Sequence, residues 1–274
     1  MKTENRQKVG LALGSGGVRG LAHVGVIKAL LRNGIPIDYL SGSSIGAWVG
    51  AHFSLYQDIE KTAEFTVGKK KEKFISFLEP TISGGLIKGE KIEILLDGWF
   101  ESGLFSDLKI PLKVVATDLI SGQKIIFTEG NLATAVRASM AVPGVFKPVI
   151  LGNQALIDGG VSDPVPVDLV KELGAEVVIA VNLDYFAGLE GMDPKKIGYG
   201  DVASGTLKIM RHYLAKYSCR GADFVIEPSL KDFSSVSGYF MKNTNDEDVI
   251  RLAEEETEKI IPALKEMVFG FKDK

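Results

Sequence analysis

Short apolar runs alternate with longer apolar or amphipathic runs along this chain. The short runs predict strands and the longer runs predict helices. The predicted strands are Val9–Leu13, Ile37–Ser41, Leu112–Ala116, Lys124–Phe127, Val177–Val181 and Phe224–Ile226. The predicted helices are Leu21–Arg32, Ile45–Leu55, Gly89–Trp99, Asn131–Met140, Val167–Leu173, Val202–Tyr217 and Asp246–Met267. This alternation indicates an α/β fold with a mainly parallel central sheet covered by helices on both faces.

No shift in composition marks a domain boundary, and no repeat is visible, so we expect a single domain over residues 1–274. Two stretches look like insertions: Glu60–Lys88 and the glycine-rich Tyr185–Gly200. Residues 69–73 read KKKEK and precede an apolar, aromatic run. This basic edge could touch anionic lipid as a peripheral membrane contact. The alternative is a solvated charged helix end, which is what charge runs usually are.

Composition excludes several classes of protein. The net charge of -3 gives no reason to expect nucleic acid as a partner. The single cysteine, Cys219, excludes an internal disulfide framework and suits a reducing compartment. The polar N-terminus lacks the features of a signal peptide, and no apolar run reaches the roughly 18 residues of a membrane span. We therefore expect a soluble cytoplasmic protein without a Cys/His metal cluster.

The segment GSSIG at residues 42–46 joins a predicted strand to a predicted apolar helix. This is the setting that a G-x-S-x-G nucleophile elbow requires. Gly42 and Gly46 lack side chains where the tight turn brings two backbones together. Ser44 would begin the helix, with its hydroxyl near the positive end of the helix dipole. A strand-to-helix turn without chemistry has the same short pattern, so Ser44 is a candidate nucleophile.

A second glycine-rich turn, GSGGVRG at residues 14–20, joins the first strand to the first helix. It is not a dinucleotide fingerprint, because Arg19 occupies the third glycine position of G-x-G-x-x-G, and it lacks the Lys-Ser/Thr pair of a P-loop. Amides of adjacent glycines can instead stabilise an oxyanion. A turn needed only for close backbone packing is the alternative. The candidate nucleophile on the next strand favours an oxyanion hole.

A serine nucleophile needs a base to accept its proton. All three histidines lie in predicted helices: His23 in the first, His52 two turns beyond Ser44 and His212 in the long late helix. In a catalytic triad with the chain order Ser-Asp/Glu-His, the histidine base lies in a late loop, and none of these three histidines is predicted to lie in a loop. A carboxylate is therefore the better candidate.

Asp158 follows an apolar strand-like run and precedes Gly159 and Gly160. The two glycines would let another backbone or a serine side chain approach its carboxylate. Burial would raise the pKa of Asp158 above its ordinary value of about 3.9 and make it a better base at neutral pH. An Asx turn before glycine is the alternative.

Taken together, these motifs resemble those of the bacterial type of patatin-like phospholipase, over about Val9–Val181 and more loosely to Pro228. The SGGVRG block at 15–20 resembles the family's glycine-rich G-G-G-x-[RK]-G, and GSSIG resembles its elbow. DGG at 158–160 resembles its D-G-[GA] motif. The segments 138–146 and 115–119 are also similar to the family's pattern. Several motifs in the right order are more specific than any one of them.

The resemblance implies a three-layer α/β/α fold of the patatin type and a serine lipid acyl hydrolase of the phospholipase A, lysophospholipase or esterase kind. It implies that Ser44 is the nucleophile and Asp158 its base, with no metal or organic cofactor. The N–H groups of Gly16, Gly17 and Arg19 would form the oxyanion hole. Ser15 stands where the family's block has its first glycine.

Two other functions stay open. An acyltransferase or thioesterase acting on acyl-CoA could share the overall fold, but malonyl transacylases typically carry histidine before the nucleophile, where this chain has Ser43. A regulatory adaptor could retain the dyad without using it. The sequence does not decide the head group, acyl length or oligomeric state.

Overall fold

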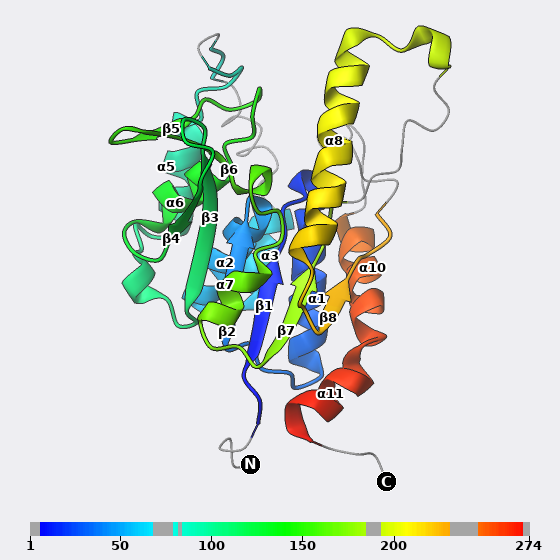
Figure 1. The fold of residues 1–274 in the computed structure, drawn as a ribbon. Coiled ribbons are helices and arrows are strands. Elements are labelled where there is room, and N and C mark those ends of the chain that lie inside the picture. The colour runs from blue at the N-terminus through cyan, green and yellow to red at the C-terminus, as the bar shows by residue number, and fades with distance from the viewer. Residues whose placement is uncertain (1–5, 68–78, 82–83, 185–192, 231–245, 271–274) are drawn as a thin grey trace.

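The structure is a computed structural model that describes residues 6–67, 79–81, 84–184, 193–230 and 246–270 (Figure 1). Its strands form one eight-stranded sheet in the order β5-β6-β3-β2-β1-β7-β8, and β4 also pairs with β3. The strands are β1 Val9–Leu13, β2 Tyr39–Ser43, β3 Leu112–Asp118, β4 Lys124–Phe127, β5 Val149–Leu151, β6 Gln154–Asp158, β7 Val177–Val181 and β8 Phe224–Ile226. The pairs that join β1, β2, β3, β7 and β8 are parallel, whereas β4, β5 and β6 pair antiparallel. The predicted mainly parallel sheet is confirmed.

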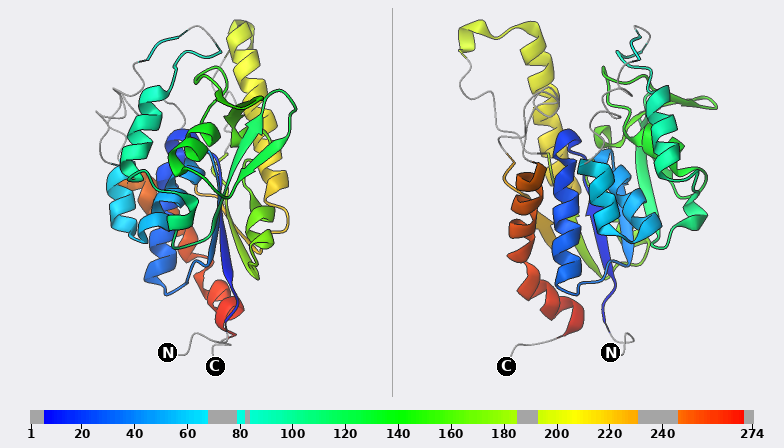
Figure 2. Two further views of the ribbon diagram at one scale, coloured as in Figure 1. Left: turned by 90° about the vertical axis from the view of Figure 1, so that its left-hand side faces the viewer. Right: turned by 180° about the vertical axis from the view of Figure 1, so that it is seen from behind.

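Helices cover both faces of this sheet (Figure 2). One face packs against α1 Leu21–Arg32, α2 Ile45–Tyr56, α3 Ile59–Val67, α5 Glu90–Trp99, α6 Leu132–Ser139, α10 Asp246–Glu258 and α11 Ile261–Phe269. The other face packs against α7 Val167–Glu172 and the C-terminal part of α8 Tyr199–Ser218. The predicted three-layer α/β/α arrangement is therefore confirmed.

Side chains along each central strand alternate between the two faces of the sheet, and this alternation explains why both faces are covered by helices. In β1, Leu11 and Leu13 belong to the larger core cluster, whereas Ala12 lies in the cluster on the opposite face. Successive side chains of a strand point to opposite faces, so a strand that is apolar throughout must be covered twice. All five residues of β1 are buried accordingly.

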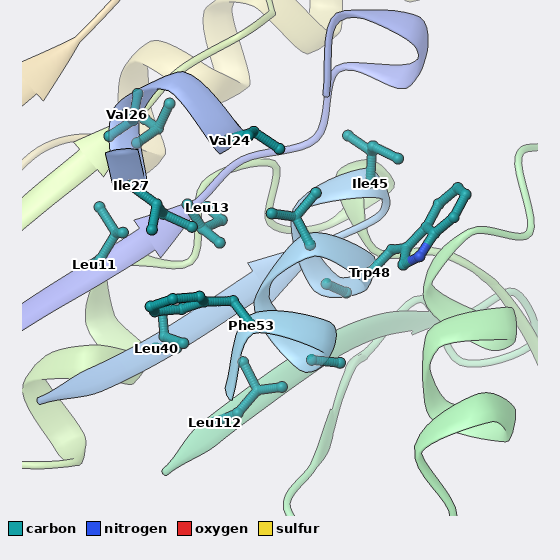
Figure 3. Packing of buried hydrophobic residues seen from close by; sticks show 14 of the residues in the cluster. Leu11, Leu13, Val24, Val26, Ile27, Leu40, Ile45, Trp48, Phe53 and Leu112 are labelled. Carbon is teal, nitrogen blue, oxygen red and sulfur yellow. The ribbon is translucent and has the colours of Figure 1, made fainter. Parts of the chain in front are cut away.

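The larger core cluster joins the first strands to the first two helices (Figure 3). Leu11 and Leu13 of β1 and Leu40 of β2 pack there with Ile27 of α1 and Phe53 of α2, and all five side chains are buried. Burying such a side chain contributes about 1.5–3 kcal/mol to stability. This packing fixes the elements that lead into and out of the turn at Ser44.

Most predicted elements are present, with four differences. The second strand is Tyr39–Ser43 rather than Ile37–Ser41, so it runs directly into the elbow. The predicted helix 246–267 is two helices, because Pro262 lies in the first turn of α11 and cannot continue the ladder of α10. Helix α8 begins at Tyr199, three residues before the predicted start. Strand β5 was not predicted, although the Gly-Asn pair at 152–153 is a hairpin signal between β5 and β6.

The predicted insertions are described only in part. The start of the first one belongs to α3, and its basic segment 69–73 lies outside the described residues. Of the second insertion the structure describes residues 193–200, which are exposed and form a short 3₁₀ turn, Pro194–Lys196, and the first turn of α8.

Candidate active site

Ser44 occupies a strained turn between β2 and α2. Its backbone has φ 56° and ψ -122°, a conformation that side-chain-bearing residues rarely adopt and that costs of order 1–3 kcal/mol. The Ser44 N–H donates a 2.8 Å hydrogen bond to the hydroxyl of Ser139, the last residue of α6. This bond from a neighbouring helix helps to hold the turn in the conformation that presents the Ser44 side chain.

The two glycines of the elbow stand where no side chain fits. A Cβ atom on Gly42 would lie 2.5 Å from Cα of Ala47, and one on Gly46 would collide with the carbonyl oxygen of Leu13. Both contacted atoms belong to the backbone, so they cannot rotate away as the end of a flexible side chain could. Close approach of β1, β2 and α2 therefore explains the glycines of this motif.

The hydroxyl of Ser44 donates a 2.6 Å hydrogen bond to Oδ2 of Asp158. Both residues are nearly inaccessible, with exposed fractions of 5% and 3%. Strand β3 brings them together, since its Val115 is the register partner of Ser43 and its next residue, Ala116, is the partner of Asp158. The sheet thus aligns two side chains that lie 114 positions apart in the sequence.

Asp158 sits at the start of a short 3₁₀ turn, Gly159–Val161, and accepts a 2.8 Å bond from the N–H of Gly160 at Oδ1. Burial raises the pKa of Asp158 above its ordinary value. The positive charge of Arg211 is the main opposing influence on this pKa, followed by the hydrogen bonds from Ser44 and Gly160. A carboxylate with a raised pKa accepts a proton more readily at neutral pH.

The glycine-rich loop lies beside the dyad. A Cβ atom on Gly160 would lie 2.8 Å from the Ser15 hydroxyl and 2.9 Å from Oδ1 of Asp158, so the missing side chain lets these groups come close. The loop is anchored by N–H bonds from Gly14 to the Val181 carbonyl, at 3.0 Å, and from Ser15 to the Pro164 carbonyl, at 2.8 Å. It leads into the 3₁₀ turn Gly17–Gly20 and then into α1.

The predicted oxyanion-hole residues lie in this loop. Gly17 has φ 57°, which favours glycine, and a Cβ atom there would meet no other residue within 4 Å. The Arg19 amide donates to the Gly16 carbonyl at 3.3 Å, which is long for an N–H···O bond. The Nε atom of the Arg19 side chain also donates to the Gly16 carbonyl, at 3.2 Å.

A buried polar network behind the loop was not predicted from the sequence. The Ser15 hydroxyl donates to Oδ2 of Asp184 at 2.6 Å, and a guanidinium nitrogen of Arg211 donates to Oδ1 of Asp184 at 2.7 Å and to the Ser15 hydroxyl at 3.1 Å. Arg19 lies 3.7 Å from the same Asp184 carboxylate. Two cations therefore surround one buried carboxylate next to the dyad.

The three histidines have other partners than the dyad in this structure. His23 is fully buried, its Nε2 lies 2.7 Å from the Gly14 carbonyl, and burial lowers its pKa to about 4. His52 Nδ1 contacts the hydroxyl of Thr62 at 2.9 Å, which agrees with a ring carried away from the elbow. His212 lies in α8, and its Nδ1 is 2.9 Å from the Asp184 carbonyl oxygen.

Within the described residues, no group of three His, Cys, Asp or Glu side chains is arranged to hold a metal ion. Nor does any helix in that part of the chain combine the length and the apolar character needed to span a bilayer.

Comparison with known proteins gives the same family as the sequence motifs. A family model of patatin-like phospholipases matches residues 11–171. An uncharacterized NTE family protein of Mycobacterium tuberculosis, Rv1063c, is 38% identical over 178 residues, which are 65% of this chain and 49% of that protein. Lysophospholipase nte1 of Aspergillus fumigatus is 31% identical over 217 residues, which are 77% of this chain and 14% of that protein. The crystal structure of VipD from Legionella pneumophila superposes with a TM-score of 0.66 at 13% identity, covering 96% of this chain and 69% of that one.

The chain spans about half the length of the mycobacterial relatives and a small part of the fungal one. The likeness to VipD supports the fold, and the family model supports the membership because it covers more than half of the chain. This chain belongs to the patatin-like phospholipase family.

Proposed function

We propose that the chain is a lipid acyl hydrolase that cleaves carboxylic ester bonds through an acyl-Ser44 intermediate. The observation that carries the proposal is the 2.6 Å hydrogen bond from the Ser44 hydroxyl to Asp158. The family model and the fungal relative named as a lysophospholipase support a lipid substrate. A cytoplasmic location stays a prediction.

In the first half of the reaction, Oγ of Ser44 attacks the ester carbonyl carbon while Asp158 takes the hydroxyl proton. The carbonyl oxygen becomes an oxyanion, for which the N–H groups of Gly16, Gly17 and Arg19 are the proposed donors. Each such donor is worth about 3 kcal/mol in the transition state. As the ester bond breaks, Asp158 returns the proton to the leaving alcohol oxygen, and the acyl group stays on Ser44.

In the second half, Asp158 takes a proton from a water molecule as its oxygen attacks the acyl carbon. The Ser44–acyl bond breaks, the fatty acid leaves, and Ser44 regains the proton from Asp158. The raised pKa of Asp158 suits both proton transfers, because a buried carboxylate binds a proton more readily than an exposed one. No step needs a histidine or a metal ion.

Hydrolysis of lysophospholipid and of a soluble short-chain aryl ester tests the proposal. We expect Ser44→Ala and Asp158→Asn each to lower kcat by about 10³-fold or more, as loss of a nucleophile or its base does elsewhere. Ser43→Ala is a matched control, since the Ser43 hydroxyl is buried and has no hydrogen-bond partner among the described residues. Unchanged hydrolysis by Ser44→Ala would end the proposal.

A further inference from the structure

Helix α8 carries a stripe of apolar side chains that faces away from the rest of the protein. Four of its members are exposed by more than half: Val202 (56%), Met210 (63%), Tyr213 (68%) and Tyr217 (62%). An α-helix turns once in 3.6 residues, so spacings of three, four and seven residues place side chains on the same side. The apolar positions 202, 209, 210, 213 and 217 follow these spacings and lie on one side of the helix, with the exposed Thr206 between them.

The opposite side of α8 contacts the protein. Arg211 binds Asp184 and Ser15, the ring of His212 reaches the Asp184 carbonyl, and Ala215 is buried in the core cluster beneath. A surface helix usually turns its apolar stripe towards the core and its polar side outwards. Helix α8 departs from this pattern, because Arg211 and His212 contact the protein beside the buried Ala215 whereas the apolar stripe lies outside.

This stripe lies at the end of the sheet that carries the dyad. Figures 1 and 2 show α8, drawn in yellow, extending past the ends of β1 and β7. The exposed side chains of Leu119 and Ile120 follow the end of β3 directly, and the exposed Val161 lies three residues beyond Asp158. Apolar groups are therefore exposed on elements that surround the catalytic end, and not on α8 alone.

The exposed charges near α8 are mainly positive. Over the described residues 193–218, four exposed lysines stand against the two acidic residues Asp193 and Asp201. The lysines are Lys195, Lys196, Lys208 and Lys216. The whole chain has a net charge of -3, so this helix and its approach are locally positive on an acidic protein. Basic residues beside an apolar helix face favour a surface of anionic lipid.

We propose that the outward stripe of α8 docks the protein on an anionic lipid bilayer, with the apolar side chains at the boundary of head groups and acyl chains. Tyrosines are enriched at that depth because they have an apolar ring and a polar hydroxyl, and the stripe contains Tyr213 and Tyr217. The part of α8 that extends past β1 and β7 lies at the dyad end of the sheet (Figure 1), so docking through α8 brings that end close to the lipid surface. The inference rests on the proposed function for its choice of lipid as the occupant.

Vesicle binding by the inactive Ser44→Ala protein tests docking without hydrolysis. The vesicles consist of phosphatidylcholine alone or of phosphatidylcholine mixed with phosphatidylglycerol. We expect stronger binding to the anionic vesicles, and we expect V202S/M210S/Y213S in the same background to lower the partition coefficient by about tenfold or more. A matched triple variant at exposed apolar residues elsewhere, L31S/L104S/M267S, should bind like the parent.

Two further measurements separate this proposal from its rivals. With Ser44 present, V202S/M210S/Y213S should retain hydrolysis of the soluble aryl ester within about twofold, because none of these side chains belongs to the proposed machinery. Equal vesicle binding by the stripe variant and its parent would overturn docking through α8, even if Ser44-dependent hydrolysis is observed. Light scattering measures the oligomeric state of the parent and of the stripe variant. A parent dimer that becomes a monomer in the stripe variant, with vesicle binding unchanged, would assign the stripe to a contact with a second copy and would also overturn the proposal.

Discussion

The hydroxyl of Ser15 donates a 2.6 Å hydrogen bond to the carboxylate of Asp184. Ser15 stands at the position where the family's glycine-rich block has its first glycine, and it ties the loop to a carboxylate that Arg211 of α8 also binds. The loop proposed to hold the oxyanion is therefore attached to α8 by side chains, in addition to its backbone bonds to Val181 and Pro164.

We predict that Ser15→Ala loosens the glycine-rich loop. The buried Asp184 loses a hydrogen-bond donor, so the free energy of unfolding should fall by about 1–3 kcal/mol. The kcat for the soluble ester should fall while KM changes little, because the loop would act mainly on the transition state. Chemical denaturation and steady-state kinetics measure the two effects. A variant that matches the parent in both would show that the contact is incidental.

The pH dependence of hydrolysis should reveal the charge of Arg211. Burial raises the pKa of Asp158, and Arg211 opposes that rise, whereas the negative charge of Asp184 adds to it. Because only the ionised Asp158 accepts a proton, kcat/KM should increase with pH through its pKa. Arg211→Gln removes the opposing cation and leaves the negative charge of Asp184 acting on Asp158, so the acid limb should move to higher pH.

Arg211→Lys is the control for this shift, since it keeps a positive charge. It should leave the acid limb close to that of the parent, even if kcat falls because the guanidinium bonds to Ser15 and Asp184 are lost. An acid limb that stays in place in Arg211→Gln would contradict an electrostatic influence on Asp158.

Substitution of the first elbow glycine should disable the site through sterics alone. In Gly42→Ala the new methyl group would lie 2.5 Å from the Ala47 backbone, so β2 or α2 must shift. We expect about 2–3 kcal/mol of lost stability and a loss of about 100-fold in kcat, because Ser44 moves with the turn. Gly98→Ala in α5 is the matched control, as its methyl group would meet no other residue within 4 Å. Equal behaviour of the two variants would contradict the steric explanation.

His23 should make the protein less stable in acid. Its pKa is about 4 in the folded protein, against about 6.5 in an unfolded chain. Between these values the unfolded chain binds a proton that the folded protein does not, so stability falls as pH decreases from 6.5 to 4. This histidine alone should lower the free energy of unfolding by about 2 kcal/mol between about pH 7 and about pH 4.5.

His23→Gln keeps a donor for the Gly14 carbonyl but does not titrate. Urea unfolding at the two pH values should therefore show a pH dependence smaller by the same amount in the variant. If both proteins lose stability equally in acid, His23 is not buried in its neutral form.

The sequence allowed the dyad and its fold to be predicted because their signals are local. The elbow and the DGG motif are each contiguous, and alternating runs of apolar residues indicate which strands are buried. In the fold, the elbow lies at the end of β2 and Asp158 at the end of β6. Both strands pair with β3, which aligns the two residues. The roles of these residues stay predictions until they are tested.

The network of Ser15, Asp184 and Arg211 could not be predicted in this way. Arg211 lies 196 positions from Ser15, and no spacing rule links one helical arginine to a distant loop. Ser139 lies in the family-like segment 138–146, but its bond to the Ser44 amide depends on how α6 packs beside α2. Such contacts are set by tertiary packing rather than by local pattern. The orientation of α8 is of the same kind, since the sequence shows an apolar stripe but not which way it faces.

Covalent labelling of Ser44 is the most direct test of the central claim, that Ser44 and Asp158 act as a nucleophile and its base. A fluorophosphonate probe loses fluoride when an activated serine attacks phosphorus, and peptide mass spectrometry locates the adduct. We predict an adduct on Ser44 in the native protein, none at this position in Ser44→Ala, and labelling slowed by about 100-fold or more in Asp158→Asn. A native protein that reacts at another serine, or does not react at all, would contradict the account and favour an adaptor that only retains the dyad.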